Sequence, residues 1–209
     1  MSTNPRLVVT GTGTDVGKTV FAAVLTAALD AFYWKPVQSG LDEGTDAERV
    51  SQIGGIPPRR IVPEAYRLAT PCSPHQAAAI DGVTIDIARL RVPDISPLVI
   101  EGAGGAMVPL RDDLLFVDLF ATWQLPVILV AQTGLGTINH SLLSIEALRS
   151  RQIPILGIAF VGEAADESEA AIVRFGRVRR LGRLPIVKRL EPADLRAAFT
   201  SSFSVADFR

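Results

Sequence analysis

The chain has 209 residues, enough for one sizeable hydrophobic core, and we predict a single domain over residues 1–209. Its formal net charge of −1 gives no overall attraction to nucleic acid or to an anionic membrane. The single cysteine, Cys72, excludes an internal disulfide and favours a reducing compartment. There is no secretory signal, and the longest apolar run, residues 125–131, is far shorter than the roughly 20 residues that cross a bilayer. We therefore expect a cytoplasmic protein without a membrane or nucleic-acid partner.

A glycine-rich stretch near the N-terminus predicts a phosphate-binding loop. Residues 11–19 read GTGTDVGKT, directly after the apolar residues 7–9 and before a long amphipathic segment. Glycines let backbone N–H groups turn inward around an anion, and the following helix adds its positive N-terminal end. Lys18 would then contact the β- and γ-phosphates, and the Thr19 hydroxyl would ligate magnesium. Gly11 lies one residue further from Gly17 than in the usual motif, so the loop is a variant form.

Apolar runs and helical stripes alternate along the whole chain. Runs rich in β-branched residues predict buried strands at residues 6–10, 33–37, 97–100, 126–131, 155–161 and 184–187. Apolar periodicity and capping residues predict helices at residues 21–32, 46–50, 75–81, 85–90, 115–124, 137–149, 166–181 and 193–203. This alternation is typical of an α/β fold with a mostly parallel central sheet and helices on both faces.

Three parts of this assignment depend on turn signals. Prolines break the segment from 54 to 74, which we assign to loop and turn with a short strand at 66–68. We expect a turn at 38–40 and a glycine turn at 102–105, each directly after a strand. The strand at 126–131 is the most hydrophobic, and we expect it to lie centrally in the sheet.

Three oxygen-bearing side chains stand at the ends of separate predicted elements. Thr19 follows the loop, Asp46 begins a short helix, and Glu101 follows the strand at 97–100. Carboxyl ends of parallel strands meet at one edge of a sheet, and Mg²⁺ prefers oxygen ligands. We favour a magnesium site made by these three residues. The alternatives are that Asp46 caps a helix and that Glu101 is an ordinary acidic loop residue.

Lys35 lies near the end of the second predicted strand, beside Pro36. A lysine next to a proline is usually solvated, but a cation at this edge of the sheet would stabilise a phosphoryl group during its transfer. From position alone the two interpretations are equally supported. We interpret His75 and His140 as ordinary helix residues, and the arginine-rich stretch at 174–183 as a solvated face.

Five motifs together resemble the dethiobiotin synthetase family. They are GTGTDVGKT at 11–19, WKPVQSG at 34–40, SPH at 73–75, EGAGG at 101–105 with Pro109 and Leu110, and GTINH at 136–140. The likeness covers nearly the whole chain and implies a P-loop NTPase-like fold. It also implies an ATP-dependent cyclo-ligase of biotin synthesis. In that family 7,8-diaminopelargonate (7,8-diaminononanoate), CO2 and MgATP give dethiobiotin, ADP and phosphate, through a carbamate and a carbamic–phosphoric mixed anhydride.

The resemblance implies roles for individual residues. Those implied in catalysis are Lys35, Lys18 and Thr14, and those implied as Mg²⁺ ligands are Thr19, Asp46 and Glu101. The residues implied in nucleotide binding are Gly13, Thr14, Asp15, Val16, Gly17, Lys18, Thr19, Asp46, Glu101, Gly102, Ala103, Gly104, Pro185, Ile186 and Val187. Those implied in binding the diamine substrate are Thr14, Ser39, Gly104, Leu135, Gly136, Thr137 and Asn139.

The family works as a symmetric homodimer in which the substrate carboxylate reaches the neighbouring subunit. The matching piece here is the helix that opens at Gly136, whose N-terminal N–H groups suit a carboxylate. Many relatives carry an Asn-Asp pair after the strand that corresponds to 155–160, where the amide reads adenine, but this chain has Val161 and Gly162. ATP is the expected cofactor together with Mg²⁺, and other nucleoside triphosphates remain alternatives.

A partition or septum-placement ATPase is the main alternative class, because such switch proteins share the variant loop. They typically carry an extra lysine near the start of the loop, where this chain has Gly11 and Thr12. They often end in a basic or amphipathic tail, which residues 203–209 do not form convincingly. The synthetase half of a glutamine-dependent cobyrinate-type amidotransferase is a third interpretation, but 209 residues leave no room for a glutaminase domain.

Overall fold

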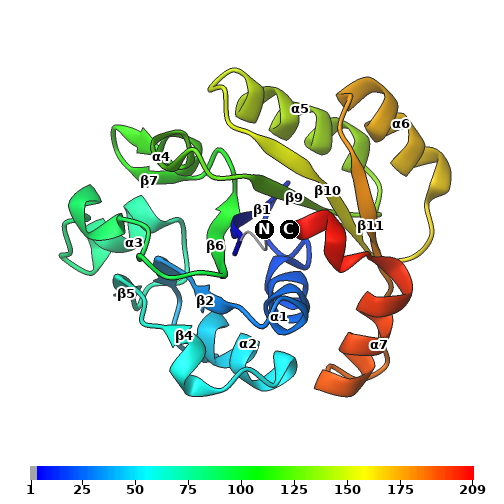
Figure 1. The fold of residues 1–209 in the computed structure, drawn as a ribbon. Helices are drawn as coiled ribbons and strands as arrows, with labels where there is room; N and C mark the ends of the chain where they lie inside the picture. The colour runs from blue at the N-terminus through cyan, green and yellow to red at the C-terminus, as the bar shows by residue number, and fades with distance from the viewer. Residues whose placement is uncertain (1–3) are drawn as a thin grey trace.

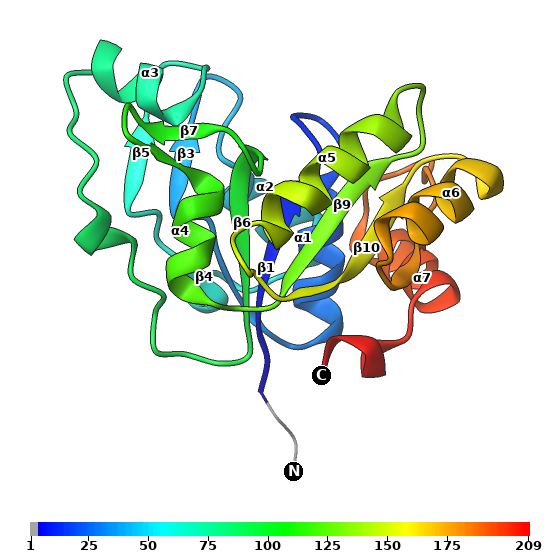
Figure 2. The same ribbon diagram turned by 90° about the horizontal axis from the view of Figure 1, so that it is seen from above.

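A seven-stranded sheet runs through the middle of the molecule, with helices on both faces (Figures 1 and 2). The structure is a computed structural model, and it describes residues 4–209. The strand order is β11-β10-β9-β1-β6-β2-β4, and every neighbouring pair in this sheet is parallel. The predicted α/β fold with a mostly parallel sheet is therefore confirmed. Residues 1–3 of the predicted domain, and with them part of the N-terminal segment for which no secretory signal is expected, lie outside the described part.

The sheets and helices have the following bounds. The central strands are β1 (Arg6–Gly11), β2 (Phe32–Trp34), β4 (Ile61–Val62), β6 (Leu98–Gly105), β9 (Val127–Gln132), β10 (Ile155–Val161) and β11 (Arg180–Leu184). Two small sheets pair β3 (Val37–Ser39) with β5 (Tyr66–Leu68) and β7 (Pro109–Arg111) with β8 (Leu114–Leu115). The α-helices are α1 (Lys18–Ala28), α2 (Asp46–Gly54), α3 (Pro74–Ile80), α4 (Phe116–Trp123), α5 (Thr137–Arg149), α6 (Asp166–Gly176) and α7 (Pro192–Ser202). Short 3-10 helices are η1 (Pro58–Arg60), η2 (Ile87–Leu90) and η3 (Val205–Phe208).

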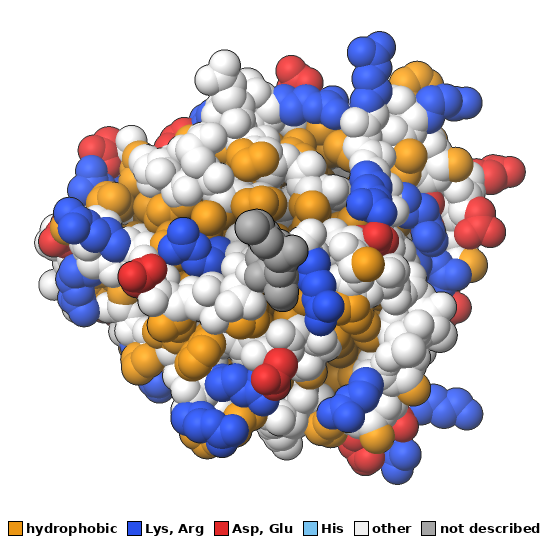
Figure 3. Space-filling model, in the orientation of Figure 1, with side chains coloured by type: hydrophobic (Ala, Val, Ile, Leu, Met, Phe, Trp, Pro, Cys, Tyr) orange, Lys and Arg blue, Asp and Glu red, His pale blue; other side chains and the backbone are white. Residues whose placement is uncertain are grey.

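Alternate residues of β1 face opposite layers of the core. Leu7 and Val9 pack with α1, α2 and α7, while Val8 packs with residues of α3 and α4. The helices α1, α2 and α7 lie on one side of the sheet and α4, α5 and α6 on the other (Figure 1). On the face shown in Figure 3, basic and acidic side chains are interspersed over the surface. Among residues 4–209, every helix is too short or too polar to cross a bilayer.

The helix after the loop is shorter than we predicted. It ends at Ala28, and Phe32 lies in β2 and not on the helical stripe. The cause is Asp30, which adopts a positive φ of 50° while the Ala31 N–H donates to Thr26 O. Helices that end at a glycine commonly show this hydrogen bonding. Here an aspartate adopts the left-handed conformation instead, and the short connection from α1 to β2 contains no glycine.

The turn predicted at 38–40 was wrong, because Val37–Ser39 forms β3. The predicted strand at 33–37 is split, and β2 ends at Trp34. Pro36 has no N–H to donate to a ladder, but its carbonyl accepts from Ala65 and Tyr66, and β3 then pairs with β5. The predicted strand at 66–68 is thereby confirmed, although its partner has no local signal in the sequence.

The last strand lies earlier in the chain than the sequence suggested. α6 ends at Gly176 rather than at residue 181, and β11 occupies Arg180–Leu184 rather than 184–187. Arg177 adopts a positive φ of 45°, which ends the helix. Buried Glu169 on α6 forms ion pairs with Arg180 and Arg183, so two arginines are tolerated in a strand.

Two smaller assignments also change. Residues 85–90 form no α-helix, and only Ile87–Leu90 adopt a 3-10 turn, whose N-cap is Asp86. β6 continues through the expected glycine turn to Gly105, because residues beyond Glu101 still pair with β1. The hydrophobic strand at 126–131 is confirmed as β9, an interior strand between β1 and β10.

The aromatic cluster under the loop helix gives a stability prediction. Phe21 is fully buried, and its ring centroid lies 5.5 Å from that of Phe203 and 6.3 Å from that of Phe208. Phe21→Ala should lower the free energy of unfolding by about 3–5 kcal/mol, because it removes this contact and leaves a cavity. The control is Phe175→Ala at a ring that is 64% exposed, expected to cost about 0.5 kcal/mol or less. Equal losses in urea unfolding of the two variants would contradict this view of the core.

Candidate active site

The loop at 11–19 follows the middle strand at the point where the chain order of the sheet reverses. β6 lies on one side of β1 and β9 on the other, so the carboxyl end of β1 opens at a topological switch point. Ligands of open α/β sheets bind at this position. α1 begins directly behind the loop, and its N-terminal N–H groups and dipole attract an anion there.

The loop is closed on itself by its own lysine. Lys18 Nζ donates to the Gly13 carbonyl at 2.7 Å, and burial lowers the pKa of Lys18 although Glu101 opposes the shift. Gly17 has a φ of 90°, and a Cβ at this position would lie 2.7 Å from Val161 Cγ1. Only glycine therefore allows the loop to turn into α1 while the end of β10 packs against it.

Strand register brings Lys35 and Glu101 together. Trp34 in β2 pairs with Ile100 in β6, so the next residue of each chain, Lys35 and Glu101, leaves neighbouring strands at the same level. Val9 in β1 pairs with Glu101 on the other side. Lys35 is 5% exposed and Glu101 is fully buried, so neither is a solvated surface charge.

Helix capping directs Asp46 into the same cluster. Thr45 is the N-cap of α2, and it forms a capping box in which Glu48 N–H donates to Thr45 Oγ1 and Thr45 N–H to Glu48 Oε2. The alternative that Asp46 itself caps the helix is therefore wrong. Gln38 Oε1 accepts from the Asp46 N–H at 3.1 Å, and the Asp46 carboxylate is left to face Lys35.

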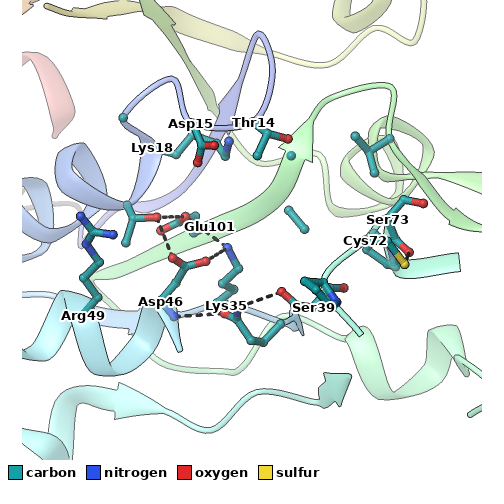
Figure 4. A pocket seen from close by; sticks show the side chains of 18 of the residues that line it. Thr14, Asp15, Lys18, Lys35, Ser39, Asp46, Arg49, Cys72, Ser73 and Glu101 are labelled. Atoms are coloured by element: carbon teal, nitrogen blue, oxygen red, sulfur yellow. Dashed lines mark hydrogen bonds and ion pairs between the residues drawn. The ribbon is translucent and has the colours of Figure 1, made fainter. Parts of the chain in front are cut away.

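The side chains of Lys35, Asp46 and Glu101 point toward one another in Figure 4. Lys35 Nζ forms an ion pair with Asp46 Oδ2 and lies 3.3 Å from Glu101 Oε1. Thr19 Oγ1 lies 2.7 Å from Glu101 Oε1 and 3.1 Å from Asp46 Oδ1. The hydroxyl has one proton, so it donates to one of these two oxygens at a time.

The pairing favours the charged forms of Lys35 and Asp46 in spite of burial. Burial opposes the charge of Lys35, but Glu101 and Asp46 outweigh it and raise the lysine pKa. Burial also opposes the charge of Asp46, but Lys35 and the hydrogen bond from Thr19 lower its pKa. The cluster therefore presents two carboxylates, an ammonium and a hydroxyl in one place.

The oxygen atoms of this cluster fit magnesium. Thr19 Oγ1 lies close to one oxygen of each carboxylate, and Mg²⁺ accepts one or two carboxylates together with phosphate oxygens and water. Residues 4–209 contain no group of three or more His, Cys, Asp and Glu that could hold a metal. A metal here would therefore depend on nucleotide phosphates to complete its ligands.

A cavity of about 680 Å³ opens over the cluster (Figure 4). It brings together most of the residues singled out from the sequence: Thr14, Asp15, Gly17, Lys18, Thr19, Lys35, Ser39, Asp46, Glu101, Ala103 and Gly104. A Cβ at Gly104 would lie 3.7 Å from Thr14 Oγ1, so the loop and the end of β6 approach each other across the cavity. The Ser39 hydroxyl is buried without a hydrogen-bond partner in the described part of the chain.

Other lining residues were missed by the sequence analysis: Val20, Gln38, Arg49, Pro71, Cys72, Ser73, Pro74 and Val108. The segment from Pro71 to Pro74 reaches the cavity because β5 pairs with β3, and a Cβ at Gly40 would lie 3.0 Å from Pro71 Cβ. In the sequence, the SPH motif at 73–75 is the one local pattern that points to a role for this segment. Ser73 Oγ lies 3.0 Å from His75 Nδ1, so this hydroxyl bonds the imidazole and leaves the α3 N–H groups uncapped.

Several predicted residues do not line the cavity. Gly13 offers its carbonyl to Lys18, Val16 is buried in the core, and Gly102 packs against Phe120. Those at the start of α5 and after β11 lie elsewhere on the molecule: Leu135, Gly136, Thr137, Asn139, Pro185, Ile186 and Val187. Leu135 and Asn139 are exposed, whereas Thr137 is buried.

The fold and the site define a class, a P-loop nucleotide-dependent protein. A family model described as an AAA domain matches residues 5–194. The fold is similar to the MinC:MinD cell division complex of Aquifex aeolicus, with a TM-score of 0.57 at 14% identity over 98% of this chain and 93% of that one. It is also similar to a ParA family ATPase of Chlorobium tepidum, with a TM-score of 0.53 at 14% identity over 96% and 91%. At such identities the likeness shows the fold alone.

Sequence relatives identify the family within this class. The chain is 62% identical to the ATP-dependent dethiobiotin synthetase BioD of Afipia carboxidovorans, over 97% of this chain and 98% of the relative. It is 58% identical to the protein of the same name from Novosphingobium aromaticivorans, over 96% and 98%. The chain belongs to the ATP-dependent dethiobiotin synthetase family, and the resemblance of the five motifs is confirmed.

The charge cluster predicts how stability depends on pH. Asp46→Asn should lower the free energy of unfolding at pH 7 by on the order of 2 kcal/mol, because it removes a charged hydrogen-bond partner of buried Lys35. The pKa of Asp46 is lowered from 3.8, so its contribution is present above pH 3.8 and disappears as the pH falls below that value. Urea unfolding of both proteins between pH 7 and pH 3 should show the difference shrinking on acidification. Asp42→Asn, at an exposed neighbour, is the control, and a difference independent of pH would contradict the assignment.

Proposed function

We propose that the protein converts 7,8-diaminopelargonate, CO2 and ATP into dethiobiotin, ADP and phosphate in biotin synthesis. The relatives that are 58–62% identical over nearly the full length support this activity. One observation supports the placement of this activity on particular residues. The buried cluster of Lys35, Asp46 and Glu101 lines the same cavity as the phosphate-binding loop. A cation and two carboxylates at this position are what phosphoryl transfer to a substrate oxygen requires.

The loop would hold the triphosphate. Its inward N–H groups, the start of α1 and the ammonium of Lys18 would bind the phosphate oxygens. Thr19, Asp46 and Glu101 would hold Mg²⁺, which would supply charge neutralisation at the phosphates. Asp15 and Gly17 line the same side of the cavity and would contact the nucleotide beside Lys18.

The other end of the cavity would hold the diamine. Ser39 offers a buried hydroxyl that has no partner within the described chain, and Thr14 and Gly104 lie close to each other on the facing wall. Burying a hydroxyl without a hydrogen-bond partner costs free energy. A substrate amine or carbamate at Ser39 would supply the hydrogen bond that the described chain does not. This unpaired hydroxyl supports the substrate role that Ser39 has by resemblance.

The reaction has three balanced steps. One amine of the substrate forms a C–N bond to CO2 and loses a proton, which gives a carbamate. A carbamate oxygen attacks the γ-phosphorus, the bond to the ADP oxygen breaks, and a carbamic–phosphoric mixed anhydride results. The second amine attacks the carbonyl carbon, the C–O bond to phosphate breaks, and the ureido ring closes with loss of a proton.

Lys35 would stabilise the charge on the moving phosphoryl group. Its ammonium is paired with Asp46 Oδ2, lies 3.3 Å from Glu101 Oε1 and lines the cavity, where it would face the carbamate and the γ-phosphate. A positioned cation of this kind lowers the barrier without reorganising during the reaction. Thr14 at the mouth of the loop would contact both reactants.

A homodimer belongs to the proposal. The start of α5 is exposed at Leu135, Ile138 and Asn139, and none of these residues lines the cavity of its own chain. A neighbouring subunit would bring the N-terminal N–H groups of this helix to the substrate carboxylate. We also place the enzyme in the cytoplasm, where the reduced thiol of Cys72 would persist.

The test of this function is the requirement for both co-substrates. ADP release should need 7,8-diaminopelargonate and bicarbonate together, and ¹³C-bicarbonate should place one labelled carbon in dethiobiotin, read by mass spectrometry. ADP release that DNA or lipid stimulates without any diamine would instead support a switch ATPase and overturn the proposal.

Lys35→Gln tests the proposed catalytic role. We expect kcat to fall by about 10²-fold or more, as loss of a positioned charge typically causes, with the circular dichroism spectrum unchanged. Arg49→Gln removes another cation that lines the cavity but is exposed, and serves as the comparison. Turnover near the wild-type value in the Lys35 variant would remove Lys35 from the chemistry.

Nucleobase recognition gives a further prediction. At the position of the family's adenine-reading amide this chain has Val161, whose apolar side chain has no hydrogen-bonding group for the base, and the next residue is Gly162, where a Cβ would lie 2.4 Å from Thr133 Oγ1. Pro185, Ile186 and Val187 would contact the base through backbone and packing, and Ile186 is exposed. We expect kcat/KM for CTP and GTP within about tenfold of ATP, since packing contacts discriminate weakly. A preference for ATP above 10³-fold in competition would show that another group reads adenine.

A further inference from the structure

Tyr33 is a buried polar residue that the proposed reaction does not use. It lies in β2, its side chain is fully buried, and its hydroxyl donates to Glu101 Oε2 at 2.8 Å. A phenol carries its proton at neutral pH and a carboxylate oxygen can only accept, so the hydroxyl is the donor of this bond. The sequence shows it only as one aromatic residue of a buried strand.

The two oxygens of Glu101 have separate partners. Oε2 accepts from Tyr33, while Oε1 faces Thr19 at 2.7 Å and Lys35 at 3.3 Å. The Glu101 side chain is fully buried, so its oxygens depend on these neighbouring groups for their hydrogen bonds. The phenol therefore sets which oxygen faces the loop.

Strand pairing fixes the phenol where it is. Tyr33 pairs with Val99 in β6 and with Ile61 in β4, so its backbone lies between two strands. Glu101 is two residues beyond Val99, and residues two apart on a strand share a face of the sheet. Tyr33 and Glu101 are thus diagonal neighbours, and the ring belongs to the core packed around α1.

We propose that Tyr33 is a positioning residue that holds Glu101 so that one oxygen, Oε1, is presented to the nucleotide-bound divalent cation. The proposal rests on the magnesium role assigned to Glu101 under the proposed function. A carboxylate with one oxygen tied by a donor cannot rotate to bind the cation with both oxygens. The ligand geometry is therefore fixed before the metal arrives, as outer partners of metal ligands do elsewhere.

The test compares two tyrosine variants of the whole protein. Tyr33→Phe should weaken Mn²⁺ binding to the protein–ADP complex by about 10–100-fold in an electron paramagnetic resonance titration, as loss of an outer partner of a metal ligand does. ADP affinity measured with EDTA should stay unchanged, because Tyr33 contacts no residue of the loop by a hydrogen bond in the described chain. In turnover, KM for Mg²⁺ should rise while kcat recovers at saturating Mg²⁺.

Tyr66→Phe is the matched control. Tyr66 is also buried, at 5% exposure; its hydroxyl accepts from the Asp86 N–H at 2.7 Å, and in the described chain it forms no hydrogen bond to Thr19, Lys35, Asp46 or Glu101. It is the only other tyrosine in the chain. Its variant should bind Mn²⁺ as the wild type does, although it too loses a buried hydrogen bond.

Melting temperature separates a local effect from general loss of stability. For each variant the melting temperature is measured with ADP alone and with ADP and Mn²⁺. The rise in Tm caused by Mn²⁺ should be smaller in Tyr33→Phe than in Tyr66→Phe, whatever the Tm of each variant without the metal. Unchanged Mn²⁺ affinity in Tyr33→Phe, or an equal loss in both variants, would overturn the proposal. Metal binding is measured without the diamine, so absence of dethiobiotin formation would refute the proposed function and leave this result standing.

Discussion

The pairing of Lys35 with Asp46 and Glu101 is the constraint on which the rest of the site depends. Charges buried to this degree are costly unless they are paired, and removing one partner leaves the others uncompensated. The pairing requires β2 and β6 to keep their register and Thr45 to cap α2, so that the helix begins at Asp46. The central sheet, the capped helix and the split between β2 and β3 are therefore parts of one electrostatic arrangement.

The same pairing explains how one cavity would serve two reactants. The loop side offers backbone N–H groups and Lys18, and the far side offers the unpaired Ser39 hydroxyl. Lys35 is held by Asp46 Oδ2, lies 3.3 Å from Glu101 Oε1 and lines the same cavity. In the proposed reaction its ammonium would face the carbamate and the γ-phosphate where the two reactants meet.

Local signals in the sequence were sufficient for the elements that carry the chemistry. GKT after an apolar run and Glu101 after a strand predicted a magnesium site, whereas the position of Lys35 near the end of a strand left its role open until the resemblance was added. The pairing of β3 with β5 had no such signal, because two three-residue strands far apart in the chain show no periodicity, and so the cavity wall at Pro71–Pro74 was missed. β11 was misplaced because the partner of its arginines, Glu169, lies on α6. Tyr33 looked like any core aromatic, since a hydrogen bond to a distant residue leaves no mark on local sequence.

Oxygen transfer from CO2 to phosphate tests the central claim most directly, that this cluster brings the γ-phosphate to a substrate carbamate. With ¹⁸O-labelled bicarbonate, ADP-forming turnover should put one labelled oxygen into the released phosphate and one into the ureido carbonyl of dethiobiotin, in equal amounts by mass spectrometry. The carbonyl serves as the internal standard for label lost to water. Phosphate without label beside a labelled carbonyl would mean that water, and not the carbamate, attacks the nucleotide, and would contradict the account.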